Sequence, residues 1–398
     1  MQTRSLRIIL IVSIGALITI YGIWWTQMIG NAQARTGTDF MAFYAAGRVA
    51  QLHGYPDMYN IRFQQNVQQT VVGFELGEGQ VLLYNHLPYL VPVLRLIVNA
   101  DYQGSFIRWE VLLALIYILT TLFLINSLFA DKDLQTRLLL AGGCLTFFPL
   151  FISIWQGQDT AFLFLGLALW CVGMLKKQDL TAAVGLTLVT TRPHLCIALA
   201  LPLVFRHWRI AWRFAGLAGV LAIFSILILT PNGVIGFLNL LRISAEGTWF
   251  GMKPEAMHNL LGLIIRSFPS LDASTINILS WIIFGIGLTV IATLWARAKY
   301  IDERLLGLTV ILLIVTAPHL HLHDLTILII PILLVIRSER LKVSHPALLL
   351  IGTSFIFLTG MLIDSLYYVL PYGVLIYLTW ALTRNKGSLP SEPLTLKE

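Results

Sequence analysis

Uninterrupted runs of apolar residues recur along the whole chain and set its architecture. The clearest runs cover Leu6–Ile29, Ile107–Phe129, Phe214–Thr230, Ile276–Ala296 and Leu366–Leu382. At 1.5 Å of rise per residue, a helix of about 20 such residues crosses about 30 Å of hydrocarbon. The runs do not alternate with polar residues, so they predict helices and exclude a transmembrane β-barrel.

Together with shorter apolar stretches, these runs predict an all-α, polytopic bundle of about 12 transmembrane helices. Of the residues, 57% are apolar and 12% are charged, whereas soluble domains carry about 25% charge. We interpret 1–383 as a single transmembrane domain and 384–398 as a disordered cytoplasmic tail. The shorter stretches lie near 138–154, 160–175, 180–191, 194–206, 305–318, 322–337 and 346–363.

The formal net charge of +7 does not indicate nucleic-acid binding, because the basic residues cluster at the ends of apolar runs. This pattern predicts cytoplasmic basic ends. Both termini are then cytoplasmic, 30–106 is a first external loop and 231–275 a second one. The clusters are Arg4/Arg7, Lys132/Arg137, Lys176/Lys177, Arg206/Arg209/Arg213, Arg297/Lys299/Arg304, Arg337/Arg340/Lys342 and Arg384/Lys386.

Three local features complete this topology. The first apolar run lacks a small-residue cleavage site, so we interpret it as an uncleaved first helix. Tyr84–Val98 is too short and too interrupted by proline to span comfortably, and it predicts a short helix along the outer face. The cysteines Cys144, Cys171 and Cys196 lie in apolar stretches, which predicts small buried side chains and no disulfide.

Asp39 is the candidate for catalysis. Residues 38–54 predict a helix, since Thr38 can cap its start and Gly54 follows its end. Asp39 then lies in the first turn, where the helix dipole favours a carboxylate that can accept a proton as a general base. The alternative is an acid at a helix start with no chemical role.

Polar side chains also gather at the external ends of later helices, where lipid would exclude them unless they have a use. Arg192 and His194 suit a phosphate group, because a guanidinium presents a planar fork of donors; interfacial anchoring is the alternative. Gln158 and Asp159 can hydrogen-bond sugar hydroxyls, or they form an ordinary polar turn.

The run Pro318–Asp324 carries His319, His321 and His323 at alternating positions. Alternate residues do not share one face of a helix, which disfavours a metal site. A cation-rich wall facing an anionic ligand is the favoured interpretation.

An uncleaved first helix followed by the Asp39 helix resembles the GT-C superfamily, and most closely glycosyltransferase family 87, over about residues 1–340. Tyr84–Leu90, Gly157–Asp159, Arg192–His194 and Pro318–Asp324 resemble the family's later motifs, in the same order. Met257–Asn259 stands where the family often has Asn-Gln-Ser. The residues that match the family's first-loop pattern are Asp39, Phe40, Tyr44, Ala46, Gly54, Pro56 and Tyr59.

The resemblance implies an inverting transferase that takes a sugar, mannose in this family, from a polyprenyl phosphate. It implies that Asp39 is the base, and it requires neither a metal nor another cofactor. The residues expected to bind the donor phosphate are Arg192, His194, His323 and Lys253. Those expected to bind sugar or acceptor are Tyr44, His86, Gln158, Asp159, His258, Asn259 and His321.

The same resemblance implies a bacterial cytoplasmic membrane location, with the active site facing the periplasm or exterior. The expected partners are membrane lipid, the lipid-linked donor and a glycolipid or glycan acceptor, with no nucleic acid. Three alternatives stay open: a transporter or lipid-linked sugar flippase, a transferase for another sugar such as a pentose, and a non-catalytic scaffold. Transporters tend to show internal repeats and mid-membrane charges, and the sequence displays neither pattern.

Overall fold

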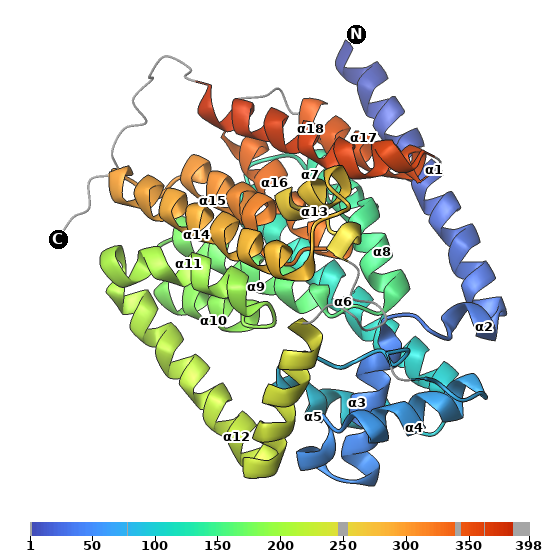
Figure 1. The fold of residues 1–398 in the computed structure, drawn as a ribbon. Helices are drawn as coiled ribbons and strands as arrows, with labels where there is room; N and C mark the ends of the chain where they lie inside the picture. Colours follow the sequence, from blue (N-terminus) through green and yellow to red (C-terminus); the bar gives the residue numbers. More distant parts are fainter. Residues whose placement is uncertain (1, 78, 246–253, 339–343, 362, 385–398) are drawn as a thin grey trace.

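The computed structural model describes residues 2–77, 79–245, 254–338, 344–361 and 363–384 (Figure 1). Every regular element within these ranges is a helix, so the all-α class is confirmed for the described part of the chain. The predicted tail beyond Arg384 lies outside the described residues.

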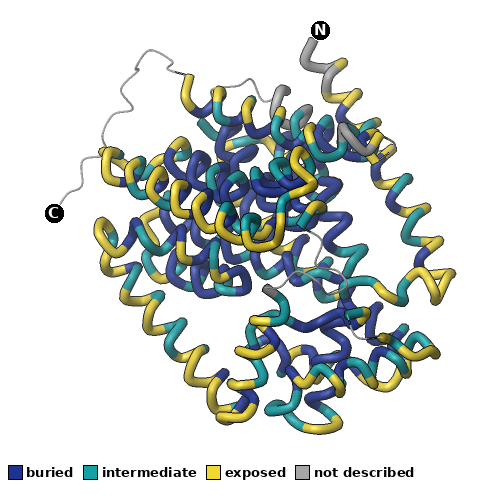
Figure 2. The backbone as a smooth tube through the Cα atoms, in the orientation of Figure 1, coloured by how far each residue is buried: buried dark blue, intermediate teal, exposed yellow. Residues whose placement is uncertain are grey.

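Among the residues that the structure describes, four helices are long and apolar enough to cross a membrane: α1 (Gln2–Gly30), α6 (Tyr102–Leu128), α12 (Trp208–Ala245) and α14 (Ala273–Arg297). Helices α1 and α12 leave most of their apolar side chains uncovered, as the yellow stretches in Figure 2 show. Soluble monomers rarely expose apolar surface on this scale, so these faces are suited to lipid.

Helices α7 (Leu134–Leu145) and α8 (Phe148–Gln156) meet at 48° and can form a fifth, bent span. The next helices are α9 (Thr160–Leu175), α10 (Asp179–Val189) and α11 (Pro193–Arg206). With 11 to 16 residues each, they are about 17–24 Å long, which is less than the hydrocarbon thickness. Four or five candidate spans are present among the described residues, so the count of about 12 is not confirmed.

The last third of the chain supplies much of the core. Helix α15 (Glu303–Thr316) is followed by the 3-10 helix η4 (His323–Leu328) and by α16 (Ile329–Arg337). All residues of η4, and all of α16 before its last, are buried. Helices α17 (Ser344–Gly360) and α18 (Asp364–Thr383) pack on this part and on each other.

Segment 31–101, between α1 and α6, forms a small helical layer beside the bundle, at the bottom of Figure 1. The short helix predicted within 84–98 is observed over Pro88–Ile97, and at about 15 Å it is too short to span a membrane. Gly47 lets α3 approach α5 closely, because a Cβ there would lie 2.9 Å from Val98. The elements are α2 (Ala32–Arg35), α3 (Phe40–Leu52), η1 (Tyr55–Asp57), α4 (Ile61–Val72), η2 (Pro88–Leu90) and α5 (Val91–Ile97).

The predicted second loop, 231–275, is more structured than expected. Helix α12 is interrupted at Thr230, the residue before Pro231, where φ is 57°. It then continues in a new direction to Ala245. This second half returns onto η1 and the residues just after it, where the rings of Tyr59 and Phe237 lie 4.8 Å apart. Beyond it the structure describes η3 (Pro254–Ala256) and α13 (Leu260–Ser267).

The α9–α10 hairpin is the most closely packed pair of helices in the bundle. A Cβ on Gly173 would lie 2.5 Å from the nitrogen of Ala182, and one on Gly185 would lie 2.3 Å from that of Trp170. Glycine is therefore required for the two backbones to approach this closely, as in many membrane helix pairs. Since α9 begins after Asp159 and α10 ends shortly before Arg192, this packing brings the two side chains to the same end of the bundle.

The topology yields a labelling prediction. The three natural cysteines are unpaired and buried, which confirms the sequence prediction and leaves little reactive background. A cysteine replacing the exposed Asn66 on α4 should react in intact cells with a membrane-impermeant maleimide. A cysteine replacing Tyr300, which is 81% exposed in a basic loop, should react only after permeabilisation. The reverse pattern would contradict the predicted orientation.

Candidate functional site

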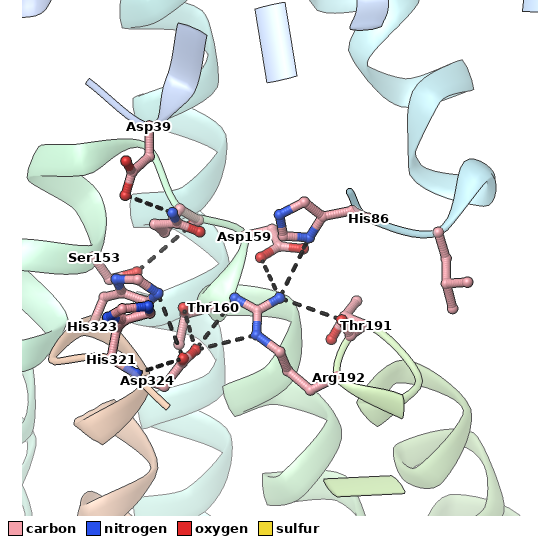
Figure 3. Close-up of polar contacts among 12 residues, drawn as sticks. Asp39, His86, Ser153, Asp159, Thr160, Thr191, Arg192, His321, His323 and Asp324 are labelled. Carbon is pink, nitrogen blue, oxygen red and sulfur yellow. Dashed lines mark hydrogen bonds and ion pairs between the residues drawn. The ribbon is translucent and has the colours of Figure 1, made fainter. Parts of the chain in front are cut away.

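Asp39 stands at the N-terminus of α3 and is partly exposed. Its carboxylate does not cap the helix; instead its Oδ2 accepts a hydrogen bond of 2.6 Å from Nε2 of Gln158 (Figure 3). Gln158 belongs to the turn between α8 and α9, 119 positions away in sequence. The structure thus joins a predicted base to a residue predicted to bind sugar.

The next residue of that turn, Asp159, points to the other side and is almost fully buried, at 1% exposure. Its Oδ1 lies 3.0 Å from Nη1 of Arg192, and its Oδ2 lies 3.1 Å from Nδ1 of His86. Burial alone would raise the pKa of Asp159, but Arg192 and His86 outweigh burial and hold it at about 2. Asp159 is therefore ionised throughout the physiological range.

Arg192 has a second carboxylate partner, Asp324 of η4, whose Oδ1 lies 3.3 Å from both Nε and Nη2. Thr160 also donates to this oxygen, and the backbone N–H of His321 donates to the other one. All three guanidinium nitrogens of Arg192 are engaged within the protein, as the dashed lines in Figure 3 show. A donor phosphate would have to share this guanidinium with two carboxylates, and the phosphate-binding role of Arg192 stays a prediction.

The three histidines of the 318–324 run line up beside this cluster. The rings of His319 and His321 are 4.5 Å apart, and those of His321 and His323 are 5.7 Å apart. Burial, then His323, lowers the pKa of His321 to about 4, and burial also lowers the pKa of His319. Burial thus disfavours the charged forms of both rings, which argues against a cation-rich wall at these two residues.

His323 faces two partners. Its Nδ1 lies 3.3 Å from Oε1 of Gln156, and its Nε2 lies 3.5 Å from Oδ2 of Asp324. His194, in the first turn of α11, is largely covered and its Nε2 has no hydrogen-bond partner. A ring nitrogen of His323 therefore lies close to Asp324, and the roles of His323 and His194 as phosphate ligands stay predictions.

The remaining predicted residues are not all brought into this cluster. Asn259 caps α13 and donates to the carbonyl of Ala317 at 2.6 Å, so its amide is used inside the fold. The hydroxyl of Tyr44 donates to the carbonyl of Asn99 at 2.9 Å. His258 is 2% exposed, and its Nε2 has no partner. Lys253 lies outside the described residues.

Sequence reasoning gave no role to Asp324, although it ends the histidine run. No local signal in the sequence links Asp324 to Arg192, because the two residues are 132 positions apart. Glu110 was also missed: it is 4% exposed on α6, and neither carboxyl oxygen has a hydrogen-bond partner. Among the described residues, no group of three or more His, Cys, Asp or Glu is arranged to hold a metal ion.

A helical bundle with long, uncovered apolar helix faces is typical of an integral membrane protein. The model of Glycosyltransferase family 87 matches residues 88–318, which is more than half of the chain. The chain belongs to this family and is a membrane glycosyltransferase. The matched range includes Gln158, Asp159 and Arg192 but not Asp39 or His323. A search of curated proteins found no match.

Replacing Arg192 by alanine should destabilise the protein strongly even without substrate. The change leaves Asp159 and Asp324 buried without their cation, and breaking a buried ion pair in this way costs about 3–5 kcal/mol. Thermal unfolding of the purified protein in detergent, with no donor present, measures this loss.

The matched control is Arg213→Ala, which removes an exposed arginine paired with Asp179 at 3.3 Å. An exposed pair contributes about 0–1 kcal/mol, so this variant should unfold close to the wild-type temperature. An Arg192→Ala protein as stable as the control would show that Arg192 does not anchor the cluster.

His258 should make the fold sensitive to mild acid. Burial, then Arg266 and His321, lowers its pKa to about 3, whereas an unfolded histidine has a pKa of about 6.5. Below pH 6.5 the unfolded chain binds a proton that the folded protein excludes, so stability falls as pH falls, by at most about 1.4 kcal/mol per pH unit. His258→Phe should flatten the slope of unfolding temperature against pH between 6.5 and 5.

The phenylalanine ring fits this place, because the His258 ring lies 5.1 Å from Tyr367 and 5.0 Å from Tyr368. His53→Phe is the control, since His53 is exposed and stacks on Phe63 at 4.0 Å. Equal slopes for His258→Phe and the wild type would rule out His258 as a source of acid sensitivity.

Proposed function

We propose that this protein transfers a sugar, with mannose as the first candidate, from a polyprenyl phosphate to a hydroxyl group of an envelope glycolipid or glycan on the outer face of the membrane. One observation carries the proposal. The Asp39 carboxylate is partly exposed, takes no part in capping α3, and is held by Gln158 beside a buried charged cluster. A carboxylate with these properties can serve as a general base.

In the proposed reaction the acceptor hydroxyl gives its proton to Asp39 while its oxygen attacks the anomeric carbon. The bond between that carbon and the phosphate oxygen breaks, and the polyprenyl phosphate departs with the electron pair. A single displacement inverts the anomeric configuration. The departing phosphate gains stability from preorganised donors and cations. We assign this task to Arg192, His194, His323 and Lys253.

No metal or other cofactor enters this proposal, and a lipid-linked donor suits a site where apolar helix faces meet polar side chains. Substrates of this kind bring an apolar chain for the membrane and a phosphate for the cluster. The orientation toward the outside of a bacterial cytoplasmic membrane rests on the distribution of basic residues. Of the sugar-contacting candidates, His86, Asp159 and His321 lie in the cluster around Arg192 and Asp324.

Asp39→Asn should abolish nearly all sugar transfer while the protein still folds and binds donor lipid. The amide keeps the shape but cannot accept the proton, and general-base help is typically worth about 10²–10⁴-fold in rate. Purified protein in detergent or proteoliposomes, given radiolabelled polyprenyl-phosphate mannose and candidate acceptors, provides the measurement.

Asp57→Asn is the matched control, because Asp57 also stands in the first turn of a helix in segment 31–101. It should retain normal transfer. Near-normal transfer by Asp39→Asn would defeat the assignment of the base. Movement of the lipid-linked sugar across the membrane without transfer, by wild-type protein, would favour a flippase instead.

A further inference from the structure

We infer that Gln158 is a positioning residue, which orients the Asp39 carboxylate for proton abstraction instead of binding the sugar. This inference rests on the proposed role of Asp39 as the base. It assigns a task to the turn between α8 and α9, and it explains why this turn packs against the start of α3.

The contact itself has a defined chemical sense. An ionised carboxylate only accepts hydrogen bonds, so the Gln158 amide must present its NH₂ group, and Nε2 lies 2.6 Å from Oδ2 of Asp39. The other end of the amide, Oε1, is buried and has no hydrogen-bond partner. The side chain of Gln158 thus forms its hydrogen bond within the protein with Asp39.

The turn is built for this close approach. Gly157 has a φ of 70°, a left-handed conformation that favours glycine. A Cβ at this position would lie 2.6 Å from Cβ of Phe40, the residue after Asp39, and 3.1 Å from Oε1 of Glu110. The carbonyl of Gly157 accepts a bond of 2.8 Å from the indole of Trp109 on α6. Any side chain here would push the turn away from α3 and break the approach of Gln158.

The following residue fixes the turn from the opposite side. Asp159 is bound to Arg192 at 3.0 Å and to His86 at 3.1 Å, and it is 1% exposed. Adjacent residues of one turn therefore face opposite ways, one into a buried ion cluster and one toward a partly exposed carboxylate. The ion pairs of Asp159 fix the backbone of the turn, and this backbone directs the side chain of Gln158 toward Asp39.

One oxygen of Asp39 is committed to Gln158, which leaves Oδ1 as the atom that takes the acceptor proton. A carboxylate that rotates freely presents this oxygen only part of the time, and displacements of about 1 Å can cost on the order of a hundredfold in rate. Removing the donor should therefore lower kcat and leave substrate affinity nearly unchanged.

The test compares Gln158→Met with Gln65→Met in purified protein, with the wild type alongside. Methionine keeps the length of the side chain and removes the donor. Gln65 is the matched control, because its Nε2 also donates over 2.6 Å, but to the neutral carbonyl of Leu76 within segment 31–101. We expect kcat of Gln158→Met to fall about tenfold to a hundredfold, the size of one hydrogen bond to an ionised group, with KM for donor and acceptor within about threefold.

Gln158→Glu is the second variant, in case Gln158→Met does not accumulate as folded protein. It preserves size and polarity but sets a second carboxylate beside Asp39, and we expect a loss of kcat at least as large. Thermal unfolding of each variant at the wild-type temperature confirms that only the site has changed.

An unchanged kcat in Gln158→Met or Gln158→Glu would overturn the inference, and so would a loss confined to KM, which would make Gln158 a substrate ligand. These results are distinguishable from failure of the proposed function. Transfer retained in Asp39→Asn removes the base itself. An inactive Asp39→Asn beside a fully active Gln158→Met removes only the positioning role.

Discussion

One guanidinium balancing two buried carboxylates is the interaction on which the rest of this site depends. Asp159 and Asp324 are 1% and 2% exposed, and each has Arg192 as its cation. Charged groups at this depth persist only when they are paired and hydrogen-bonded. The arginine therefore fixes the relative places of the α8–α9 turn, the end of α10 and η4, three parts of the chain that are distant in sequence.

The backbone packing that makes this pairing possible is set by glycine. Gly173 and Gly185 allow α9 and α10 to lie in direct contact, so that the two ends of the hairpin emerge together with Asp159 and Arg192. A third glycine, Gly157, lies in the turn between α8 and α9 and lets that turn touch α3. The glycines let the helices approach closely, and this approach lets Asp159 and Arg192 pair. The pairing in turn fixes the turn that holds Gln158 beside Asp39.

The class of fold and most of the helices could be predicted from the sequence, because continuous apolar runs that end at clusters of basic residues are strong signals of membrane helices. It was not sufficient for the number of spans. Stretches such as 180–191 are apolar because they are buried against other helices, and apolarity alone does not distinguish burial in protein from burial in lipid. The continuation of α12 after Pro231 was missed because proline usually ends a helix, whereas here the helix kinks and then continues.

Most residues of the site could be selected from the sequence, but the contacts between them could not. Asp39, Gln158, Asp159 and Arg192 were all selected, yet their pairing depends on long-range contacts that local patterns do not encode. Burial also changed the expected chemistry of His319 and His321, since removal from water disfavours the charged form of a histidine. Asn259 was expected to bind sugar or acceptor, and in the structure its amide caps α13 and donates to the carbonyl of Ala317.

The charge balance of the cluster constrains how a phosphate could leave. Asp159 and Asp324 together carry two negative charges and Arg192 one positive charge, so the cluster is net negative unless a histidine is protonated. A departing phosphate in the same place adds further negative charge, and Arg192 alone cannot offset it. A second cation would then be needed, and Lys253 is the candidate that the sequence offers. The carboxylates that hold Arg192 in place also offset its positive charge, so in the proposed reaction the stabilisation of the departing phosphate requires a second positive group.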